Sequence, residues 1–419
     1  MAVNQDTSDT MQLLYMVTVF LIRCYKRVEY GILRLIGPLI LPIVIKKLDQ
    51  VGITINKGGP CDIKNRNFMT SQDTVYIRAI NEGILGFGES YMDGDWDAED
   101  IPAVFYKIFA NDAPILRMFM NPWNRFLYYM QFSFFNLQTK QRVYDVAKIH
   151  YDLGNEFFEN MLDSTMNYTC GYFKDTDNLE KAQLAKMDFV AAKLGIKQGM
   201  TVLDIGCGFG GMARHLAINY GATVTAVTIS KEQATFAQQA CRGLPVTVKV
   251  MDYRDVSGTY DRVVSLGDLE HIGPANYGTF FKTVSRCLKE DGLCLIHCMG
   301  NYHDVMPHQE PFSAKYVFPG ACLPYYTEVM GSLQNLFLIE DWHNFGNDYN
   351  LTSVAWRDNF IRNWPKLQQL DKIKYDDRFY RMWTFYLGVA IALYKARKIQ
   401  LWQIVLSKHG VVGGYRSVR

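Results

Sequence analysis

Hydrophobic positions in the second half of the chain fall into short runs that amphipathic or turn-rich segments separate. Five runs have the length of β-strands, at residues 201–205, 223–228, 246–250, 262–266 and 293–296. Strands that alternate with helices favour a parallel sheet with helices on both faces, because each crossover returns the chain through a helix. The pattern therefore predicts a doubly wound, Rossmann-like α/β fold.

Two further apolar segments lie near the N-terminus, at residues 11–22 and 30–45, with a basic stretch between them. Arg34, Pro38 and Pro42 interrupt the second segment, and neither reaches the roughly 20 apolar residues that a membrane span needs. We therefore expect separate helices that lie in a membrane interface. A packed helix, a short transmembrane anchor and a targeting segment are the alternatives; a secretory signal is disfavoured, because no basic residue precedes the first segment.

The region between these segments and the predicted sheet is rich in aromatic residues from Phe87 to Phe135. Aromatic residues at helical spacing usually form a core, and a lid or a lipid-entry surface is the alternative. The expected parts are a membrane-proximal segment at 1–46, a small, mainly helical domain at 47–136 and the sheet domain at 137–419.

The first predicted strand runs directly into a glycine-rich loop, in which Gly206, Gly208 and Gly210 alternate with other residues. Glycines let a loop approach a ligand closely, and the next helix offers free N–H groups at its N-terminus. The G-x-G-x-G spacing differs from the dinucleotide fingerprint, and no Lys-Ser/Thr pair follows for a nucleoside triphosphate. Asp204 before the loop suits a cationic, amino-acid-bearing ligand, so S-adenosylmethionine fits, with a glycine turn in another α/β enzyme as the alternative.

Polar residues also follow the other predicted strands, at the edge where ligands bind in a doubly wound sheet. Ser230 and Gln233 are placed for the ribose or adenosyl group, and Asp252 for the adenine edge. Each alone is more often a helix cap or a loop residue. The predicted cofactor-binding residues are Tyr168, Thr169, Asp204, Gly206, Cys207, Gly208, Gly210, Thr228, Ile229, Ser230, Gln233, Asp252 and Tyr253.

Composition narrows the classes of protein. The 419 residues carry 44 basic and 42 acidic side chains, a net charge of +2, which argues against a nucleic-acid partner. Nine cysteines show no paired spacing, and Cys207 lies inside the glycine loop, so we expect reduced thiols and a cytosol-facing protein. Cysteines and histidines crowd residues 294–308 without the C-x-x-C spacing of structural zinc, and we expect no metal.

Nine motifs are spread along the chain, among them Gly88-Glu-Ser-Tyr-Met-Asp-Gly-Asp-Trp96. The others lie at residues 135–138, 150–155, 166–172, 203–211, 227–233, 270–274, 345–349 and 399–403. Over about residues 46 to 410 the chain resembles the cyclopropane-fatty-acyl-phospholipid synthase family, in its two-domain form. The resemblance implies an enzyme that uses S-adenosylmethionine to add a methylene group across a cis double bond of a phospholipid acyl chain. It also implies a cytoplasmic protein, peripheral on the phospholipid bilayer, for which we leave a homodimer open.

The same resemblance implies catalytic residues. Methyl transfer to an alkene leaves a carbocation, which aromatic faces stabilise, so Tyr151, Tyr168 and Tyr172 are candidates. A base must then remove a proton from the new methyl group, and in the family this base is held to be a bicarbonate ion. The positions that match its pocket are Cys170, Glu270, His297 and Tyr349.

Three residues depart from the family pattern. Met299, which we also include among the predicted catalytic residues, replaces an isoleucine beside the predicted pocket, and Ala390 replaces a cysteine to which a catalytic role is sometimes assigned. Asp268 stands where an apolar residue is usual, and it would raise the pKa of Glu270 if both acids face the pocket. The alternatives are a lipid methyl- or methylene-branching enzyme, a small-molecule N-methyltransferase and a lipid-binding relative without turnover.

Overall fold

The computed structural model describes residues 9–53, 55–56, 68–70, 74–110, 122–132, 134–140, 153–301 and 310–419. The chain forms two compact units. The helical unit comprises Met1–Thr139, His303–Pro319 and Trp364–Lys398, and the sheet unit comprises Lys140–Tyr302, Gly320–Asn363 and Ile399–Arg419. Two segments from the later part of the chain thus belong to the helical unit. The domain boundaries expected from the sequence stay a prediction.

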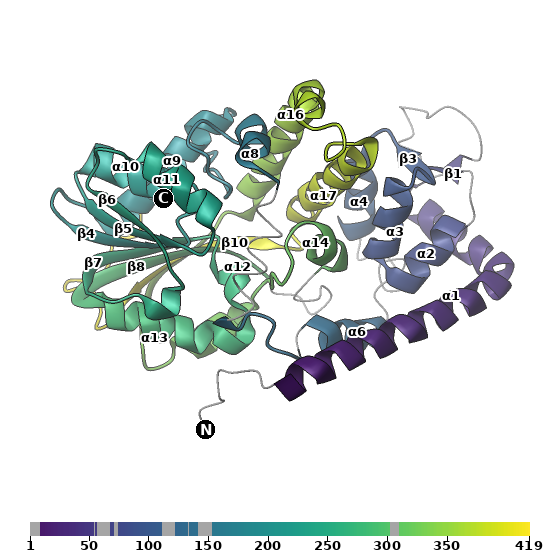
Figure 1. Cartoon of the computed structure of the whole chain (residues 1–419), viewed down its shortest axis with the longest axis horizontal. Coiled ribbons are helices and arrows are strands. Elements are labelled where there is room, and N and C mark those ends of the chain that lie inside the picture. Colours follow the sequence, from purple (N-terminus) through teal and green to yellow (C-terminus); the bar gives the residue numbers. More distant parts are fainter. Residues whose placement is uncertain are drawn as a thin grey trace. The chain divides into compact units, whose positions relative to one another are not determined.

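The sheet unit is built around one seven-stranded sheet (Figure 1). The parallel strands are β4 (Thr201–Ile205), β5 (Thr223–Thr228), β6 (Val246–Val250), β7 (Tyr260–Leu266) and β8 (Leu288–Gly300). The antiparallel strands β9 (Leu338–Asn344) and β10 (Gln400–Ser407) extend it, in the order β6-β5-β4-β7-β8-β10-β9. The predicted α/β fold is confirmed, and each predicted run lies within one of the parallel strands.

Alternate residues of the central strand β4 serve opposite faces of the sheet. Val202 belongs to a core with α9 (Leu179–Leu194), α10 (Gly211–Tyr220) and α11 (Lys231–Ala240). Leu203 belongs to a second core with α13 (Tyr277–Cys287) and α15 (Tyr326–Leu333). Figure 1 shows α10 and α11 on one side of the strands and α13 on the other. The remaining elements of this unit are α8 (Asn155–Met161), η1 (Tyr253–Asp255), α12 (Leu269–Ile272), η2 (Pro274–Asn276) and most of α16 (Gly346–Leu370).

The helical unit has a small sheet and seven described helices. Its strands are β1 (Ile55–Asn56), β2 (Phe68–Thr70) and β3 (Trp96–Ala98), in the order β1-β2-β3. Its helices are α1 (Asp9–Gln50), α2 (Thr74–Glu82), α3 (Ile84–Met92), α4 (Ile101–Ala110), α6 (Pro122–Phe132), α14 (Pro311–Tyr316) and α17 (Asp377–Lys395). Ala390, the position of the missing cysteine, lies in α17 and thus in the helical unit.

The N-terminal apolar segments form one continuous 42-residue helix, α1, so the separate helices predicted from the sequence are wrong. A proline removes one backbone donor and bends a helix without always ending it, and α1 continues through Pro38 and Pro42. Within the described chain, α1 is the one helix that could cross a membrane by length and composition. Most of its apolar side chains are exposed, so it is not a core helix.

Lys26 attaches α1 to its neighbours in the helical unit. Its buried ammonium donates to the backbone oxygen of Asn81 at 2.6 Å, to Oδ1 of Asn124 at 2.6 Å and to Oε2 of Glu29 at 2.7 Å. Asn81 lies in the last turn of α2, where free carbonyl groups favour a cation. One charged side chain therefore connects α1 with both α2 and α6.

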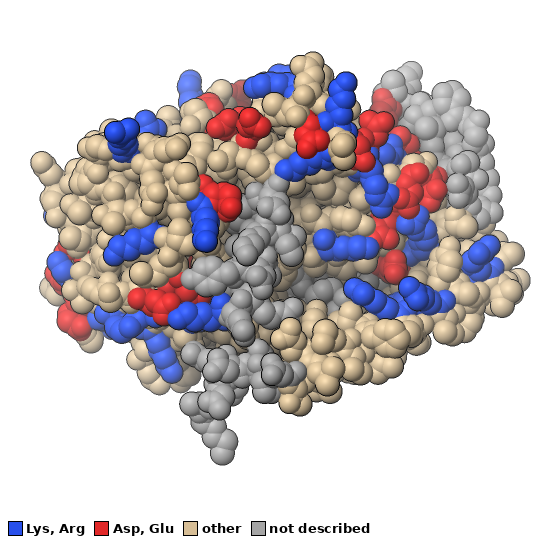
Figure 2. All heavy atoms as spheres, in the orientation of Figure 1, with Lys and Arg blue, Asp and Glu red and all other residues tan. Residues whose placement is uncertain are grey.

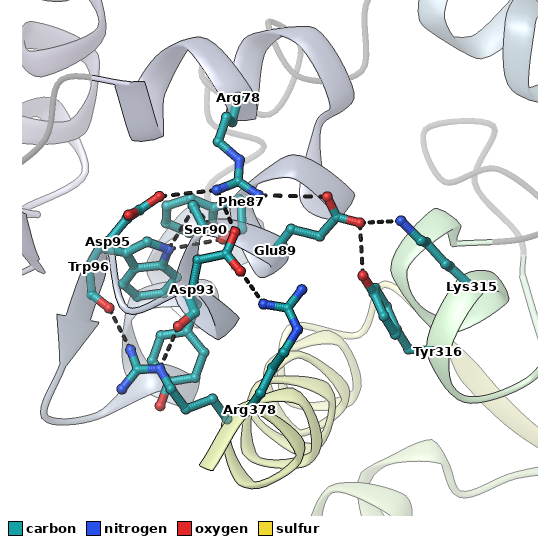
Figure 3. A network of polar contacts seen from close by, with 12 residues as sticks. Arg78, Phe87, Glu89, Ser90, Asp93, Asp95, Trp96, Lys315, Tyr316 and Arg378 are labelled. Atoms are coloured by element: carbon teal, nitrogen blue, oxygen red, sulfur yellow. Dashed lines mark hydrogen bonds and ion pairs between the residues drawn. The ribbon is translucent and has the colours of Figure 1, made fainter. Parts of the chain in front are cut away.

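The Gly88–Trp96 motif spans α3 and the start of β3 and forms a network of ion pairs (Figure 3). Arg78 on α2 contacts three acids of the motif, Asp93 at 2.8 Å, Asp95 at 3.0 Å and Glu89 at 3.6 Å. Asp93 also pairs with Arg378 on α17, and Glu89 accepts hydrogen bonds from Lys315 and Tyr316 on α14. The motif thus holds α14 and α17 within the helical unit.

Candidate active site

The predicted cofactor and catalytic residues that the structure describes all belong to the sheet unit. Most follow the carboxyl ends of β4, β5, β6, β7 and β8, and the chain order of the strands reverses direction between β4 and β7. A doubly wound sheet binds ligands at such a switch point. Tyr151 lies outside the described residues, so its predicted role stays a prediction.

The glycine loop turns sharply between β4 and α10. Gly206, Gly208 and Gly210 all have positive φ, at 76°, 53° and 84°, a conformation that favours glycine. The N–H groups of Gly206 and Cys207 donate to the carbonyl of Val227 at 2.9 and 3.0 Å, which ties the loop to β5. A side chain at Gly210 would meet Ala237 at 2.9 Å, so glycine lets the loop pack closely on α11.

The residues after β5 form a hydrogen-bonded turn beside this loop. Ser230 caps α11 by accepting from the backbone N–H of Gln233 at 3.2 Å, and Thr228 Oγ1 donates to Gln233 Oε1 at 3.1 Å. The Gln233 amide nitrogen lies 3.9 Å from where a side chain at Gly208 would begin. Ile229 is partly buried between Thr228 and Ser230. The turn therefore aims an amide group at the glycine loop.

Asp252 and Tyr253 follow β6. The Asp252 carboxylate accepts from the backbone N–H of Arg254 at 2.9 Å and from its guanidinium at 2.8 Å. A ligand that binds Asp252 would therefore share the carboxylate with Arg254. The Tyr253 ring packs beneath the same guanidinium, 4.7 Å from its carbon, and burial raises the pKa of the hydroxyl. The predicted contact of Asp252 with adenine and the predicted cofactor contact of Tyr253 stay predictions.

Two carboxylates at the switch point have no counter-ion in contact among the residues that the structure describes. Asp204 is buried, and one of its oxygens makes no hydrogen bond within the described chain. Burial raises its pKa to about 7, and the nearby charge of Asp268 acts in the same direction. Burial and the charge of Asp252 raise the pKa of Asp268 to about 6. Such a pair is suited to a cationic ligand.

Lys186 is a buried residue of this region that the sequence reasoning missed. Its ammonium donates to Asn167 Oδ1 at 3.0 Å and to Thr169 Oγ1 at 2.9 Å, and burial lowers its pKa to about 8. Its charge lowers the pKa of Asp204 and of Cys170. Lys186 therefore influences both the predicted cofactor pocket and the predicted anion pocket. The burial of Lys186 could have been predicted from the sequence, because the residue shares the buried face of α9 with Ala182.

Three predicted catalytic residues meet in one small cluster. Cys170 and the partly buried Met299 and Tyr349 pack together around Phe345 and Leu401. Burial raises the pKa of the Cys170 thiol well above its usual value, so the group is a neutral thiol at physiological pH. The Oγ1 of Thr352 contacts its sulfur at 3.7 Å.

Glu270 connects to this cluster through Met299, whose backbone N–H donates to Glu270 Oε1 at 2.5 Å. The other oxygen, Oε2, is buried and makes no hydrogen bond with a described residue. Burial raises the pKa of Glu270 to about 8, and Asp268 adds only a minor contribution, so the predicted coupling of the two acids is secondary to burial. Glu270 is therefore a protonated acid near neutral pH.

His297 lies on β8 opposite Gln403 of β10. Gln403 Nε2 is 3.2 Å from His297 Nδ1, and burial lowers the pKa of the ring well below its usual value. With the Gln403 amide in this orientation its nitrogen donates to Nδ1, and the proton of the neutral ring is then assigned to Nε2. Nε2 has no described partner, so it is a free donor. Gln403 is a further residue whose role the sequence did not reveal.

Aromatic rings line the same region. The Trp356 ring lies 5.0 Å from the ring of Tyr168 and 5.9 Å from that of Tyr349, centre to centre. Tyr172, by contrast, stacks on Phe189 at 4.4 Å. Thr169, next to Tyr168, lies against β7, since a side chain at Gly267 would meet its methyl group at 2.9 Å. Among the described residues no group of three metal-ligating side chains occurs.

Comparison with known proteins agrees with this geometry. Residues 138–404 match the family model of mycolic acid cyclopropane synthetase. The chain is 44% identical over 372 residues to the cyclopropane-fatty-acyl-phospholipid synthase of Escherichia coli K12, which covers 89% of this chain and 94% of that protein. This chain belongs to the cyclopropane synthetase family. It is an S-adenosylmethionine-dependent methyltransferase of the cyclopropane synthase type, as predicted.

More distant relatives extend the comparison. The tuberculostearic acid methyltransferase of Mycobacterium tuberculosis is 29% identical and covers 82% of this chain and 83% of its own length. A cyclopropane synthase structure from M. tuberculosis aligns with a TM-score of 0.60 at 27% identity, over 63% of this chain and 98% of that one. A mycolic acid cyclopropane synthase complexed with SAH aligns with the same TM-score at 28% identity. These structures support S-adenosylmethionine as the cofactor.

Proposed function

We propose that this enzyme transfers a methylene group from S-adenosylmethionine to the cis double bond of unsaturated phospholipid acyl chains and closes a cyclopropane ring. The observation that carries the proposal is the 44% identity to the Escherichia coli phospholipid synthase over 94% of that protein's length. A match of this extent reaches well beyond the cofactor-binding sheet. A branching methyltransferase and a lipid-binding relative without turnover are the alternatives.

The proposed reaction proceeds in two bond-forming steps. The π electrons of the alkene bond to the methyl carbon while the sulfur keeps the electron pair of the broken S–C bond, which leaves a carbocation. Loss of a proton from the new methyl group then supplies the electron pair that closes the ring. We propose that Tyr168, Tyr349 and Trp356, whose rings pack against one another, stabilise the cation and that their surroundings exclude water.

The proton acceptor is proposed to be a bicarbonate ion. Two groups fit such an anion: the Nε2–H of His297, which has no described partner, and the protonated carboxyl of Glu270, whose Oε2 has none. The hydroxyl of Tyr349 and the neutral thiol of Cys170 line the same cluster. Bicarbonate held there would supply the base, and these residues would orient it. Because the four side chains are themselves neutral, the anion would be the one charged group among them.

Lipid mass spectrometry after expression in a host that lacks this activity tests the proposed product. A lipid that is heavier by one methylene and resists alkene-specific derivatisation is a ring. A heavier lipid that still reacts is a methylene branch, and a saturated methyl branch would resist derivatisation but carry two further hydrogens. A fully folded enzyme that binds S-adenosylmethionine but yields no modified lipid would favour the lipid-binding relative.

Glu270→Gln should lower kcat by about 100- to 1,000-fold, since a buried group that orients the base is lost. Tyr349→Phe should cost about 1 to 3 kcal/mol of transition-state stabilisation. Calorimetry should show unchanged S-adenosylmethionine affinity in both variants, and the parent rate should fall when bicarbonate is stripped from the buffer. Parent-like turnover in both variants, with no response to bicarbonate, would refute the anion pocket.

The helical unit is proposed to dock on the bilayer through α1 and α6 as a peripheral, cytoplasmic element. Figure 2 shows the edge along α1 as mostly uncharged, with basic side chains beside it. Its exposed apolar residues include Leu13, Leu14, Phe20, Leu21, Val28, Ile32, Leu35, Leu39 and Ile43 on α1, and Trp123, Phe126 and Tyr129 on α6. The exposed basic residues of α1 are Arg23, Arg27, Arg34 and Lys46, which suit anionic headgroups.

A peripheral position is favoured over a membrane span because Lys26 is buried and hydrogen-bonded to Asn81 and Asn124. A spanning α1 would have to break these contacts and bring the ammonium into lipid. The double change Leu35→Ser, Leu39→Ser should reduce sedimentation with anionic vesicles, whereas Ile373→Ser, equally exposed on another part of the chain, should not. Equal vesicle binding by parent and double variant would count against this surface. A homodimer stays a prediction.

A further inference from the structure

Asp268 is the departure from the family pattern that lies closest to the glycine loop. A side chain built on Gly206 would meet Asp268 Cβ at 2.7 Å, Cγ at 2.7 Å and Oδ1 at 2.8 Å, so the carboxylate lies directly against the loop. Asp268 stands at the start of α12 but does not cap it. Within the described chain its carboxylate makes no hydrogen bond and no ion pair. Neither helix capping nor an ion pair therefore explains an acid at this position.

The charged groups around Asp268 leave this part of the pocket negative. Asp204 is buried beside it, and the carboxylate of Asp252 is already paired with Arg254. Lys186 is the nearby cation that opposes Asp204, but its ammonium is already bonded to Asn167 and Thr169. Buried Asp204 and partly buried Asp268 thus lie close together without a contacting cation among the described residues, which favours a positive ligand.

The place of Asp268 along the sheet indicates which positive group it meets. The polar residues proposed for the nucleoside follow β5 and β6, whereas Glu270 follows β7 and His297 lies near the carboxyl end of β8. Asp268 lies between them, two residues before Glu270 and against the loop after β4. The sulfur that carries the reactive methyl must also lie between its nucleoside and the reacting alkene.

We propose that Asp268 recognises the sulfonium charge of S-adenosylmethionine and so discriminates the methyl donor from its product S-adenosylhomocysteine, whose sulfur is neutral. The inference rests on the methyl donor assigned above and extends it. An apolar residue at this position would contact donor and product alike, since the two differ there in charge and one methyl group. A carboxylate adds an attraction that disappears once the methyl has been transferred, which favours exchange of product for fresh donor.

Calorimetry of the full chain with the two ligands tests this role. The ratio of the product Kd to the donor Kd should fall by about tenfold in Asp268→Asn, because one charge-assisted contact is lost only for the donor. Sinefungin carries an amine in place of the methylated sulfur, so its binding to Asp268→Asn should weaken together with that of the donor. Asp291→Asn removes the same charge from an exposed site near the amino end of β8 and should leave the ratio unchanged.

Each other outcome has a distinct meaning. Equal weakening of donor and product in Asp268→Asn would place the carboxylate at the amino group that both ligands share and would overturn the proposal. An unchanged ratio in both Asp268→Asn and Asp268→Leu would also overturn it, while a parent protein that binds neither ligand would instead refute the methyl donor itself. Thermal melting of each variant checks that it is folded before the ratio is interpreted.

Discussion

Two groups of acidic residues in this molecule share one chemistry and have opposite surroundings. In the helical unit, Glu89, Asp93 and Asp95 each contact at least one arginine or lysine side chain (Figure 3). In the sheet unit, Asp204 and Asp268 have no contacting cation among the described residues, and Asp204 is almost fully buried. Paired acids hold elements together, whereas unpaired buried acids raise the energy of the free protein.

The pKa values follow the same division. Hydrogen bonds from Arg378 and Arg78 outweigh burial and lower the pKa of Asp93, whereas burial raises the pKa of Asp204 to about 7. Burial also raises the pKa of Asp268 to about 6. Unpaired carboxylates with raised pKa values are typical of binding sites, so this division distinguishes the acids that hold the helical unit together from the acids that we propose to bind the methyl donor.

The largest expected effect in this comparison is on cofactor affinity. Asp204→Asn should weaken S-adenosylmethionine binding by about 10- to 100-fold, because the loop loses the charge that complements a cationic ligand. Asp93→Asn removes an acid of the paired group and should leave the affinity unchanged in the same calorimetric titration. Similar affinity in both variants would show that pairing does not distinguish the two groups.

The next effect concerns stability. Arg78→Met should lower the stability of the helical unit by about 1 to 3 kcal/mol, because three acids lose a shared partner that is itself mostly buried. Scanning calorimetry should show the loss as an earlier transition with unchanged cofactor affinity. Arg357→Met, which breaks one exposed pair with Asp358, is the matched control and should cost less than about 0.5 kcal/mol. Equal losses in the two variants would argue against a shared network.

The smallest effect is a dependence on pH. A carboxyl whose folded pKa is raised binds more protons in the folded protein than in the unfolded chain, so its ionisation destabilises the fold as pH rises from about 4 through the folded value. The double variant Asp204→Asn, Asp268→Asn should therefore match the parent near pH 4 and melt about 2 to 4 °C above it at pH 7.5 without ligand.

The difference between the two proteins is the quantity to measure, because buried His297 has a lowered pKa and destabilises the fold of both proteins as the pH falls below the usual histidine value. Asp93→Asn should show the reverse pattern: it should lower the melting temperature at neutral pH, and this loss of stability should disappear as Asp93 of the parent is protonated in acid. A melting difference that stays constant from pH 4 to 7.5 would contradict unpaired acids at the glycine loop.

Much of the sheet could be predicted from the sequence, because each parallel strand is an apolar run bounded by turn-forming residues. The antiparallel strand β10 was missed, although all eight of its residues are buried. A strand that is buried on both faces shows no polar–apolar alternation, and the neighbours of β10 in the sheet, β8 and β9, are distant in sequence. The continuous α1 was missed because the basic stretch between the two apolar segments was taken as a break, as were the prolines within the second segment.

The candidate site was predictable where a residue follows a strand and was not where its role depends on a distant partner. Glu270 and Asp204 could be placed from their strands alone. Lys186 reaches Thr169 from the buried face of α9, and Gln403 meets His297 through a strand pairing across 106 positions. Such contacts arise from tertiary packing, which single-sequence patterns do not contain.

The order of the strands has a consequence for how the enzyme is made. β10 lies between β8 and β9 in the sheet, yet it is the last of the three to leave the ribosome. Until it emerges, β9 has no neighbouring strand and His297 lacks the Gln403 amide that fixes its proton. A nascent chain that stops before β10 can therefore form the glycine loop, while β9 is still unpaired and His297 still lacks its contact with Gln403.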